Sequence, residues 1–301
     1  MTNLTIRQML YFDALAQTLH FGRAAELAGV TQPALSAQIA ELEERLGCRL
    51  FERGGRSVRL TEEAAALQPR IESILAQIRE VEAVARRGRR TMQGRFRLGM
   101  IPTVAPYLLP QVLPELKQRF PELQLELREA VTMALVTETA AGRIDGFVAA
   151  LPLDHPGLVT ETLFDDRFFL AVPEQDADFV APPVPPESPA LERLMLLEEG
   201  HCLRDQALKI CGSVRPTALS SYGATSLTTL LQMVGHGLGV TLIPEMAAES
   251  SQVIRDLKIV PFAEPVPSRE IALAWRRNSP RQEECRELAG ILRALRDTVM
   301  A

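Results

Sequence analysis

Long apolar runs are missing from this chain of 301 residues. No stretch approaches the roughly 18 uninterrupted apolar residues that a membrane-spanning helix needs, so we expect no membrane association. Arg7 and Asp13 interrupt the apolar pattern near the N-terminus, which argues against a signal peptide. Cysteine is scarce as well, with four in the chain, and this excludes a secreted disulfide scaffold. We therefore expect a cytoplasmic protein, in which any disulfide would be transient and redox-sensing.

Aromatic residues make up only 5% of the chain, yet 47% hydrophobic and 24% charged residues are typical of a folded globular protein. The length predicts two or three domains. Residues 1–95 carry 14 basic side chains (Lys and Arg) and 11 acidic ones, a balance of +3, although the whole chain has a net charge of −5. The N-terminal part alone could therefore approach an anionic polymer.

Three helices and a hairpin are predicted over the first 60 residues, and apolar residues recur at helical spacing in the first helix, at Ile6, Leu10, Phe12, Leu15 and Leu19. A second helix is expected over residues 23–28, and Gly29 supplies the turn that follows. Thr31 is expected to cap the third helix, with Pro33 in its first turn. The inward-facing residues of this helix are Leu35, Ile39, Leu42 and Leu46. The pattern is typical of a helix-turn-helix; an αα-hairpin with a solvated polar face is the alternative.

Short polar groups on the outward face of the third helix suit contacts to base edges and phosphates. After this helix, the dipeptide Gly54-Gly55 predicts a tight turn between β-prone runs, flanked by arginines that would grip phosphates, as in the wing of a winged helix. A solvated charged turn explains these arginines equally well. The expected DNA contacts are Arg23, Thr31, Gln32, Pro33, Ser36, Gln38, Arg53 and Arg56.

A long helix is predicted to begin after a Thr61 cap. Its apolar residues follow a heptad spacing over roughly three repeats, at Leu67, Ile71, Ile74, Ile78, Val81 and Ala85. Such a stripe would be exposed to water on a single helix, so it predicts pairing with a second copy of the chain. The basic tract 86–90 is expected to end the helix and residues 88–94 to form a hinge; a second nucleic-acid contact is the alternative for the basic tract.

Strand and helix patterns alternate after residue 95, which favours an α/β fold with ligand sites at the carboxyl ends of strands. Strands are predicted at 96–101, 123–127, 146–150 and 163–172, and helices at 107–120, 132–141 and 280–300. The chain is expected to cross near 165–169 and to return near 268–274, which would divide this region into two lobes. The predicted domains are a winged helix-turn-helix (1–60), a linker helix and hinge (61–94) and an effector domain (95–301), with lobe I at 95–166 and 269–301 and lobe II at 167–268.

Cys202 and Cys211 stand nine positions apart, at either end of a run of helix-forming residues without Gly or Pro. If this run is one helix, the two positions lie about 13 Å apart along its axis. A disulfide needs Cα atoms within about 7 Å, so oxidation would have to unwind the helix and act as a switch. The alternative is that both cysteines are small buried apolar residues.

Cys202 is the better candidate to react first, because a helix N-terminus and a nearby cation favour a thiolate, and Arg204 follows two residues later. Cys211 would lie at the last turn, where the helix dipole opposes negative charge. Cys202 would thus attack a peroxide and become a sulfenic acid, which Cys211 would resolve to a disulfide. The nine-residue spacing lacks the close ligand pair of a zinc site, so we expect no metal. Cys48 and Cys285 are expected to be structural.

The run Gly-His-Cys-Leu-Arg-Asp-Gln-Ala at 200–207, with a second cysteine nine residues after the first, resembles the redox centre of the OxyR hydrogen-peroxide sensors within the LysR-type transcriptional regulators. Further similarity lies at residues 23–46, 99–110, 224–227 and 237–244. Together these segments span nearly the whole chain. The resemblance implies an all-α winged helix-turn-helix N-terminal domain with a long linker helix, followed by an α/β two-lobed, periplasmic-binding-protein-like effector domain.

The resemblance also implies what the chain does. It would be a transcriptional activator of oxidative-stress genes rather than an enzyme, without a cofactor. Its partners would be promoter DNA, hydrogen peroxide, RNA polymerase and further copies of the chain in a dimer of dimers. The implied peroxide pocket consists of Thr103, Thr132, His201 and Arg269 around Cys202. Hydroxyls there would hydrogen-bond the departing oxygen while the thiolate attacks the other one.

Two other functions remain open. One is a regulator gated by a small organic effector, with inert cysteines. The other is a thiol peroxidase, against which residues 1–46 argue because a catalyst needs no DNA-reading head. The segment 212–220 departs from the better-known members of the family, where acidic residues follow the second cysteine, and Pro216 would stiffen it. The oxidised geometry is therefore less well predicted than the chemistry.

Overall fold

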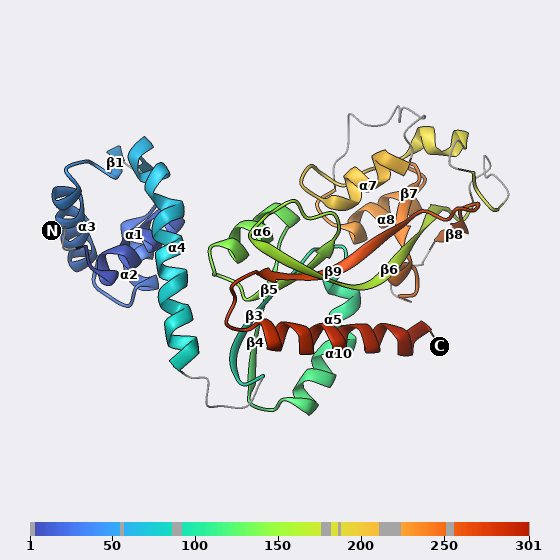
Figure 1. The fold of residues 1–301 in the computed structure, drawn as a ribbon. Coiled ribbons are helices and arrows are strands. Elements are labelled where there is room, and N and C mark those ends of the chain that lie inside the picture. The colour runs from blue at the N-terminus through green and yellow to red at the C-terminus, as the bar shows by residue number, and fades with distance from the viewer. Residues whose placement is uncertain are drawn as a thin grey trace. The chain divides into compact units, whose positions relative to one another are not determined.

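The computed structural model describes residues 4–54, 57–85, 92–175, 182–185, 188–210, 224–250 and 256–300. The chain divides into a compact N-terminal unit built on residues 1–88 and an effector unit that holds most of the residues from 89 onward (Figure 1). Among the residues in these ranges, no helix is both long and apolar enough to pass through a membrane.

Three helices build the first part of the N-terminal unit: α1 (Ile6–Thr18), α2 (Phe21–Leu27) and α3 (Gln32–Leu46). Three of the apolar residues whose spacing predicts the first helix are exposed. Ile6 and Leu10 are 51% and 46% exposed, because they lie on the side of α1 opposite the buried Phe12 and Leu15. Leu19 is 43% exposed because it ends the helix in a left-handed conformation. The helix itself is as predicted.

The turn between α2 and α3 follows the prediction at Gly29, which has a φ of +65°. Thr31 occupies the N-cap position of α3, but its side chain makes no capping hydrogen bond, contrary to the prediction. Pro33 stands at the second helical position and has no N–H to donate, which removes one of the two usual partners of a capping hydroxyl. The Thr31 side chain is exposed instead.

A hairpin follows α3, as predicted. Its strands are β1 (Phe51–Gly54) and β2 (Ser57–Leu60), paired antiparallel. The turn, and Arg56 with it, lies outside the described residues, and so does the side chain of Arg53. These two predicted DNA contacts therefore stay predictions.

The long helix α4 (Glu62–Ala85) begins at Thr61, whose hydroxyl caps it as predicted. Its apolar stripe is divided between two surroundings. Ile74 and Val81 are exposed, at 39% and 70%. The stripe residues that pack against the core of the N-terminal unit are Leu67, Ile71 and Ile78. Part of the stripe is thus covered within its own unit. The exposed pair Ile74 and Val81 remains available for the predicted pairing with a second chain, which stays a prediction.

The effector unit contains a mixed sheet whose seven described strands run in the order β4-β3-β5-β9-β6-β7, with β8 also paired to β6. Strand β3 is parallel to β4 and to β5, so the carboxyl ends of these three strands meet at one edge, and the loops after β3 and β4 lie side by side. The elements are β3 (Gly94–Met100), α5 (Ala105–Arg119), β4 (Leu123–Glu129), α6 (Thr132–Ala140), β5 (Gly146–Ala150), β6 (Leu158–Pro173), η1 (Pro189–Arg193), α7 (Cys202–Ile210), α8 (Leu227–Gly235), β7 (Thr241–Pro244), α9 (Glu245–Ala248), β8 (Leu257–Pro261), β9 (Ser268–Arg276) and α10 (Gln282–Met300).

Strand β6 passes from one half of the sheet to the other and so joins two lobes (Figure 1). Its residues 158–167 pair with β9, and its residues 168–173 pair with β7 and β8. One hydrophobic core, the lobe I core, includes Trp275, and another, the lobe II core, includes Phe168. The predicted two-lobed effector fold is confirmed, whereas the numbered boundaries of domains and lobes stay a prediction.

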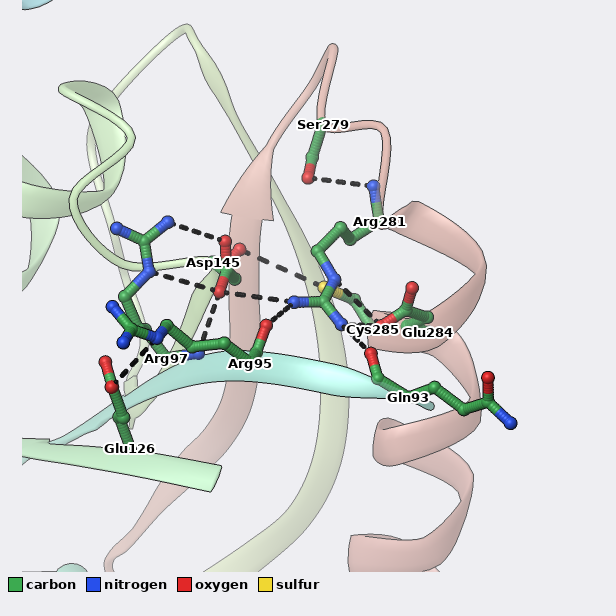
Figure 2. Close-up of polar contacts among 9 residues, drawn as sticks. All are labelled: Gln93, Arg95, Arg97, Glu126, Asp145, Ser279, Arg281, Glu284 and Cys285. Carbon is green, nitrogen blue, oxygen red and sulfur yellow. Dashed lines mark hydrogen bonds and ion pairs between the residues drawn. The ribbon is translucent and has the colours of Figure 1, made fainter. Parts of the chain in front are cut away.

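Cys285 lies on α10, is fully buried and has its Sγ 4.0 Å from the carbonyl oxygen of Asp145 (Figure 2). Burial raises the pKa of this thiol to about 12, and the nearby carboxylates act in the same direction. Near Cys285, Arg281 donates a hydrogen bond to the carbonyl oxygen of Arg95 and so links the start of β3 to the start of α10. Its guanidinium also lies over the ring of Phe96, 4.7 Å from the centroid. These contacts support a structural role for Cys285.

We expect Cys285 to resist alkylation by iodoacetamide in the folded protein at pH 8, because a pKa of about 12 leaves on the order of one thiol in 10⁴ ionised. Unfolding in urea should restore the reactivity of an ordinary cysteine. Mass spectrometry of the alkylated peptides measures both states, with the half-buried Cys48 as the internal comparison. Rapid labelling of Cys285 in the folded protein would contradict its burial.

Candidate functional site

Cys202 is the first residue of α7 and stands where the two cores of the effector unit meet. Its half-buried side chain packs against the lobe I core, whereas Leu203 and Ala207 of the same helix belong to the lobe II core. The N-terminal end of a helix carries partial positive charge, so α7 places positive potential at this thiol. The predicted helix is confirmed from Cys202 to Ile210, and Cys211 lies outside the described residues.

His201 precedes this thiol and is 7% exposed. Burial lowers the pKa of its imidazole, and the charge of Glu198 opposes this shift to a smaller extent. The ring is therefore mostly neutral at pH 7, with one nitrogen able to donate a hydrogen bond and the other able to accept one. Its Nδ1 atom is buried without a hydrogen-bond partner in the part of the chain that the structure describes.

Thr132 is the first residue of α6. Gly200 has a φ of +94° and faces Val131 so closely that a Cβ atom there would lie 3.8 Å from Val131 Cγ2. The segment that carries His201 therefore contacts the start of α6, where Thr132 lies. Thr132 Oγ1 and Gln206 Oε1 are also buried, and neither has a partner within the described ranges. Because buried polar atoms are normally hydrogen-bonded, the atoms of His201 and Thr132 on these two contacting segments are suited to hold a small polar ligand.

A second polar cluster joins Thr103, in the loop after β3, to Arg269 on β9 and Asp166 on β6. All three side chains are buried. Arg269 Nη1 donates to Thr103 Oγ1 at 2.9 Å, and Nη2 donates to the Thr103 carbonyl oxygen at 3.1 Å. The same guanidinium donates through Nε and Nη2 to Asp166 Oδ2, at 3.0 and 2.8 Å. The structure thus brings two of the predicted pocket residues, Thr103 and Arg269, into direct contact.

The two clusters share no hydrogen bond among the described residues, so a single peroxide pocket that contains all four predicted residues stays a prediction. Arg204, the cation expected beside the thiol, donates to the carbonyl oxygen of Leu197 at 3.0 Å. That bond fixes its guanidinium to the backbone before α7. The N-terminus of α7 supplies positive potential at Cys202.

Three residues near the site were not predicted from sequence: Tyr107, Asp166 and Gln206. Tyr107 packs against both cores, and burial raises the pKa of its phenol, although a hydrogen bond with Thr228 acts in the opposite direction. Gln206 follows Cys202 by four residues and so shares its face of α7, a spacing that could have identified it. Tyr107 and Asp166 gave no such signal, because their partners come from distant parts of the chain.

Apart from Arg53 and Arg56 of the hairpin, the predicted DNA-contacting residues lie on α2, at the N-cap of α3 and in the first half of α3. The exposed ones are Arg23, Thr31, Gln32 and Pro33, and the partly exposed ones are Ser36 and Gln38. Gln38 donates through Nε2 to Glu41 at 2.9 Å, so its amide is already engaged within α3. Gln32 Oε1 lies 3.6 Å from the position that a Cβ atom would take on Gly22, next to Arg23. The first turns of α2 and α3 therefore lie close together, with Arg23 and Gln32 exposed.

Comparison with known proteins gives matches over nearly the whole chain. Residues 6–65 match the bacterial regulatory helix-turn-helix protein, lysR family, and residues 89–296 match the LysR substrate binding domain. The DNA-binding transcriptional dual regulator OxyR of Escherichia coli K12 is 37% identical over 294 residues, 98% of this chain and 96% of that protein. A probable hydrogen peroxide-inducible genes activator of Streptomyces viridosporus is 41% identical over 299 residues, 97% of this chain and 95% of that protein. The structure of a full-length OxyR variant from Pseudomonas aeruginosa is similar with a TM-score of 0.78 at 33% identity, over 97% of this chain and 98% of that one.

Proposed function

The chain belongs to the LysR family of DNA-binding transcriptional regulators, and from this premise we propose that it regulates oxidative-stress genes, mainly as an activator, through a reversible Cys202–Cys211 disulfide formed by hydrogen peroxide. The observation that carries the proposal is the position of Cys202. It begins α7, is half-buried where the lobe I and lobe II cores meet, and lies next to buried polar atoms without partners among the described residues. The names of the relatives support the same assignment.

The proposed reaction takes place in two steps. The Cys202 thiolate attacks one oxygen of hydrogen peroxide; an S–O bond forms, the O–O bond breaks, and the departing hydroxide takes up a proton to become water. The Cys211 thiolate then attacks the sulfenic sulfur and displaces a second hydroxide, which is also protonated. Two thiols thereby lose two electrons, and the peroxide is reduced to two waters. A dithiol reductant reverses the change by thiol–disulfide exchange.

Formation of this disulfide requires part of α7 to unwind. The helix extends from Cys202 to Ile210, which places these residues about 12 Å apart along the axis. The next residue in the chain lies about 3.8 Å from Ile210 Cα and can shorten the distance to Cys202 to no less than about 8 Å, whereas a disulfide needs Cα atoms within about 7 Å. We propose that this unwinding is the switch, and that it changes how the helix-turn-helix units of the assembly bind promoter DNA.

The proposed peroxide pocket uses the four predicted residues with separate tasks. The hydroxyls of Thr103 and Thr132 donate to the oxygen that departs as hydroxide, and Arg269 holds Thr103 in place. His201 is mostly neutral at pH 7 and offers either a donor or an acceptor without adding charge. Gln206 joins the pocket in this proposal because its buried Oε1 has no partner within the described ranges.

DNA binding is proposed to use two kinds of contact. Gln32, at the exposed start of α3, is suited to read a base edge, since an amide can bond adenine through two atoms. Arg59, exposed on β2, is suited to a phosphate, which positions the protein without reading the sequence. The hairpin would then act as the wing of a winged helix-turn-helix.

Gln32→Ala and Arg59→Ala should separate these two kinds of contact. We expect Gln32→Ala to weaken binding to the preferred site by roughly 1–3 kcal/mol and to relax preference at one base pair. Arg59→Ala should weaken binding to all sequences similarly and reduce the slope of log K against log salt by about 1. Fluorescence anisotropy at several salt concentrations, with specific and scrambled duplexes, measures both effects. Equal loss on both duplexes for Gln32→Ala would contradict its reading role.

Assembly and partners complete the proposal. The exposed pair Ile74 and Val81 on α4 is the proposed pairing surface, in a dimer of dimers that recruits RNA polymerase at promoters in the cytoplasm.

The domains are proposed to span 1–60, 61–94 and 95–301. The protein is proposed to act stoichiometrically and not as an enzyme; multiple turnover of peroxide with a thiol reductant would contradict this.

Titration of the reduced full-length protein with hydrogen peroxide tests the proposed function. We expect two thiols per chain to be lost at micromolar peroxide, with one disulfide between Cys202 and Cys211 in the peptide map. Paired DNA footprints before and after oxidation should differ. If thiols are retained at micromolar peroxide and a small organic metabolite alters the footprint instead, the protein is a regulator gated by an organic effector.

A further inference from the structure

A buried ion pair lies on the two strands that join the lobes. Asp166 on β6 and Arg269 on β9 are register partners, and both side chains are fully buried. Burial of a charged pair is unfavourable unless the remaining donors and acceptors are satisfied. Both oxygens of Asp166 are satisfied: Oδ2 accepts two N–H groups of Arg269, and Oδ1 accepts the backbone N–H of Met246 at 3.1 Å. The carboxylate therefore has one defined orientation.

The guanidinium that Asp166 holds also fixes Thr103. Because Thr103 Oγ1 accepts a hydrogen bond from Arg269, the hydroxyl hydrogen points away from the guanidinium and is left to donate elsewhere. The Thr103 carbonyl oxygen accepts a second N–H of the same group, so backbone and side chain are held together. The oxygen that leaves a peroxide during attack by a thiolate gains negative charge, and a hydroxyl pre-oriented as a donor stabilises that charge.

We infer that Asp166 is a positioning residue for the reaction of Cys202 with hydrogen peroxide, an inference that rests on the proposed function. The Asp166 carboxylate sets the plane of the Arg269 guanidinium, and Arg269 in turn presents the Thr103 hydroxyl as a donor. Asp166 also compensates the charge of Arg269, so that Arg269 acts by orienting Thr103. Phe168, whose ring lies 5.8 Å from Arg269 Cζ, covers another side of the pair.

Asp166→Asn tests this inference, because the amide keeps the shape of the carboxylate but replaces one acceptor oxygen with an NH₂ donor. Since both oxygens accept hydrogen bonds, the NH₂ group must face either Arg269 or the N–H of Met246. We expect the rate of sulfenic acid formation at Cys202, measured by quenched flow in full-length protein that also carries Cys211→Ser, to fall about 10- to 100-fold. Alkylation of Cys202 by iodoacetamide needs no donor for a departing oxygen and should change less than about threefold.

Asp165→Asn is the matched control, because it makes the same chemical change one position earlier, on the exposed face of β6. Both rates should be unchanged in this variant. Thr103→Val removes the hydroxyl itself, so the combination with Asp166→Asn should be no slower than the slower single variant. If Asp166→Asn does not fold, Asp166→Glu serves instead, since it keeps the charge and displaces the carboxylate by one methylene; slow peroxide oxidation with normal alkylation is again expected.

The inference is wrong if Asp166→Asn reacts with peroxide at a rate within about twofold of the unsubstituted protein, or if its peroxide and alkylation rates fall equally. It is also wrong if the fold losses in peroxide rate caused by Asp166→Asn and Thr103→Val multiply in the combined variant. Failure of the proposed function gives a different result, because the unsubstituted protein itself would then keep its thiols in micromolar peroxide.

Discussion

Cys202→Ser will leave the protein unresponsive to hydrogen peroxide, with one DNA footprint before and after treatment. A serine hydroxyl is almost entirely protonated at neutral pH and cannot replace a thiolate as nucleophile, so neither a sulfenic acid nor a disulfide can form at this position. We expect the fast phase of thiol loss to disappear, a decrease of at least about 10³-fold in rate. Thiol counting during peroxide titration, together with paired footprints, measures the effect.

Cys211→Ser is the companion variant, with the opposite expected chemistry. Cys202 remains in place at the start of α7, so the first step should proceed and stop at the sulfenic acid. Trapping with dimedone and mass spectrometry should show one modified residue and no intramolecular disulfide. A normal footprint change in Cys202→Ser, or a disulfide in Cys211→Ser, would show that another thiol carries the response.

The second large effect is expected at Gly239, in the tight approach between two segments of lobe II. A Cβ atom there would lie 2.5 Å from the carbonyl oxygen of Arg193 and 2.8 Å from Met195 Cγ. The nearest atom belongs to the backbone and cannot move aside as a flexible side chain can. Gly239→Ala should therefore lower the free energy of unfolding of the effector unit by roughly 3 kcal/mol, a value at the upper end for overpacking. Thermal melting followed by circular dichroism measures the loss.

Gly290→Ala provides a matched control for this prediction. Gly290 lies exposed within α10, and no atom comes within 4 Å of the position of its added Cβ. Alanine is the better helix former, so this substitution should raise stability by up to about 1 kcal/mol. The same chemical change thus has opposite expected signs at two positions. A melting temperature of Gly239→Ala equal to or above that of the unsubstituted protein would contradict the close packing at Gly239.

Local signals made most of the fold predictable from the sequence. The run between Gly200 and Gly212 contains good helix formers, and the helix observed there begins at Cys202 as predicted. The strand at 146–150 was predicted from a short apolar run, and it is fully buried in the sheet. Such features depend on near neighbours in the chain, which the sequence displays directly.

Features that depend on distant partners were not predictable in this way. Asp166 meets Arg269 across 103 positions, and nothing in the sequence near either residue identifies the other. The spacing of the apolar residues predicts α1 but not which of them are buried, because the helix has apolar residues on two sides and only tertiary packing decides that Ile6 and Leu10 are exposed.

The position of β9 in the sheet has a consequence for how the protein is made. Residues 268–276 form a central strand, between β5 and β6, and so complete the interior of the sensor only after most of the chain has been synthesised. The helix-turn-helix is finished some two hundred residues earlier, and domains generally fold as units from the N-terminal end during synthesis. During synthesis, the helix-turn-helix of each new chain can therefore fold before the sheet of the effector unit is complete.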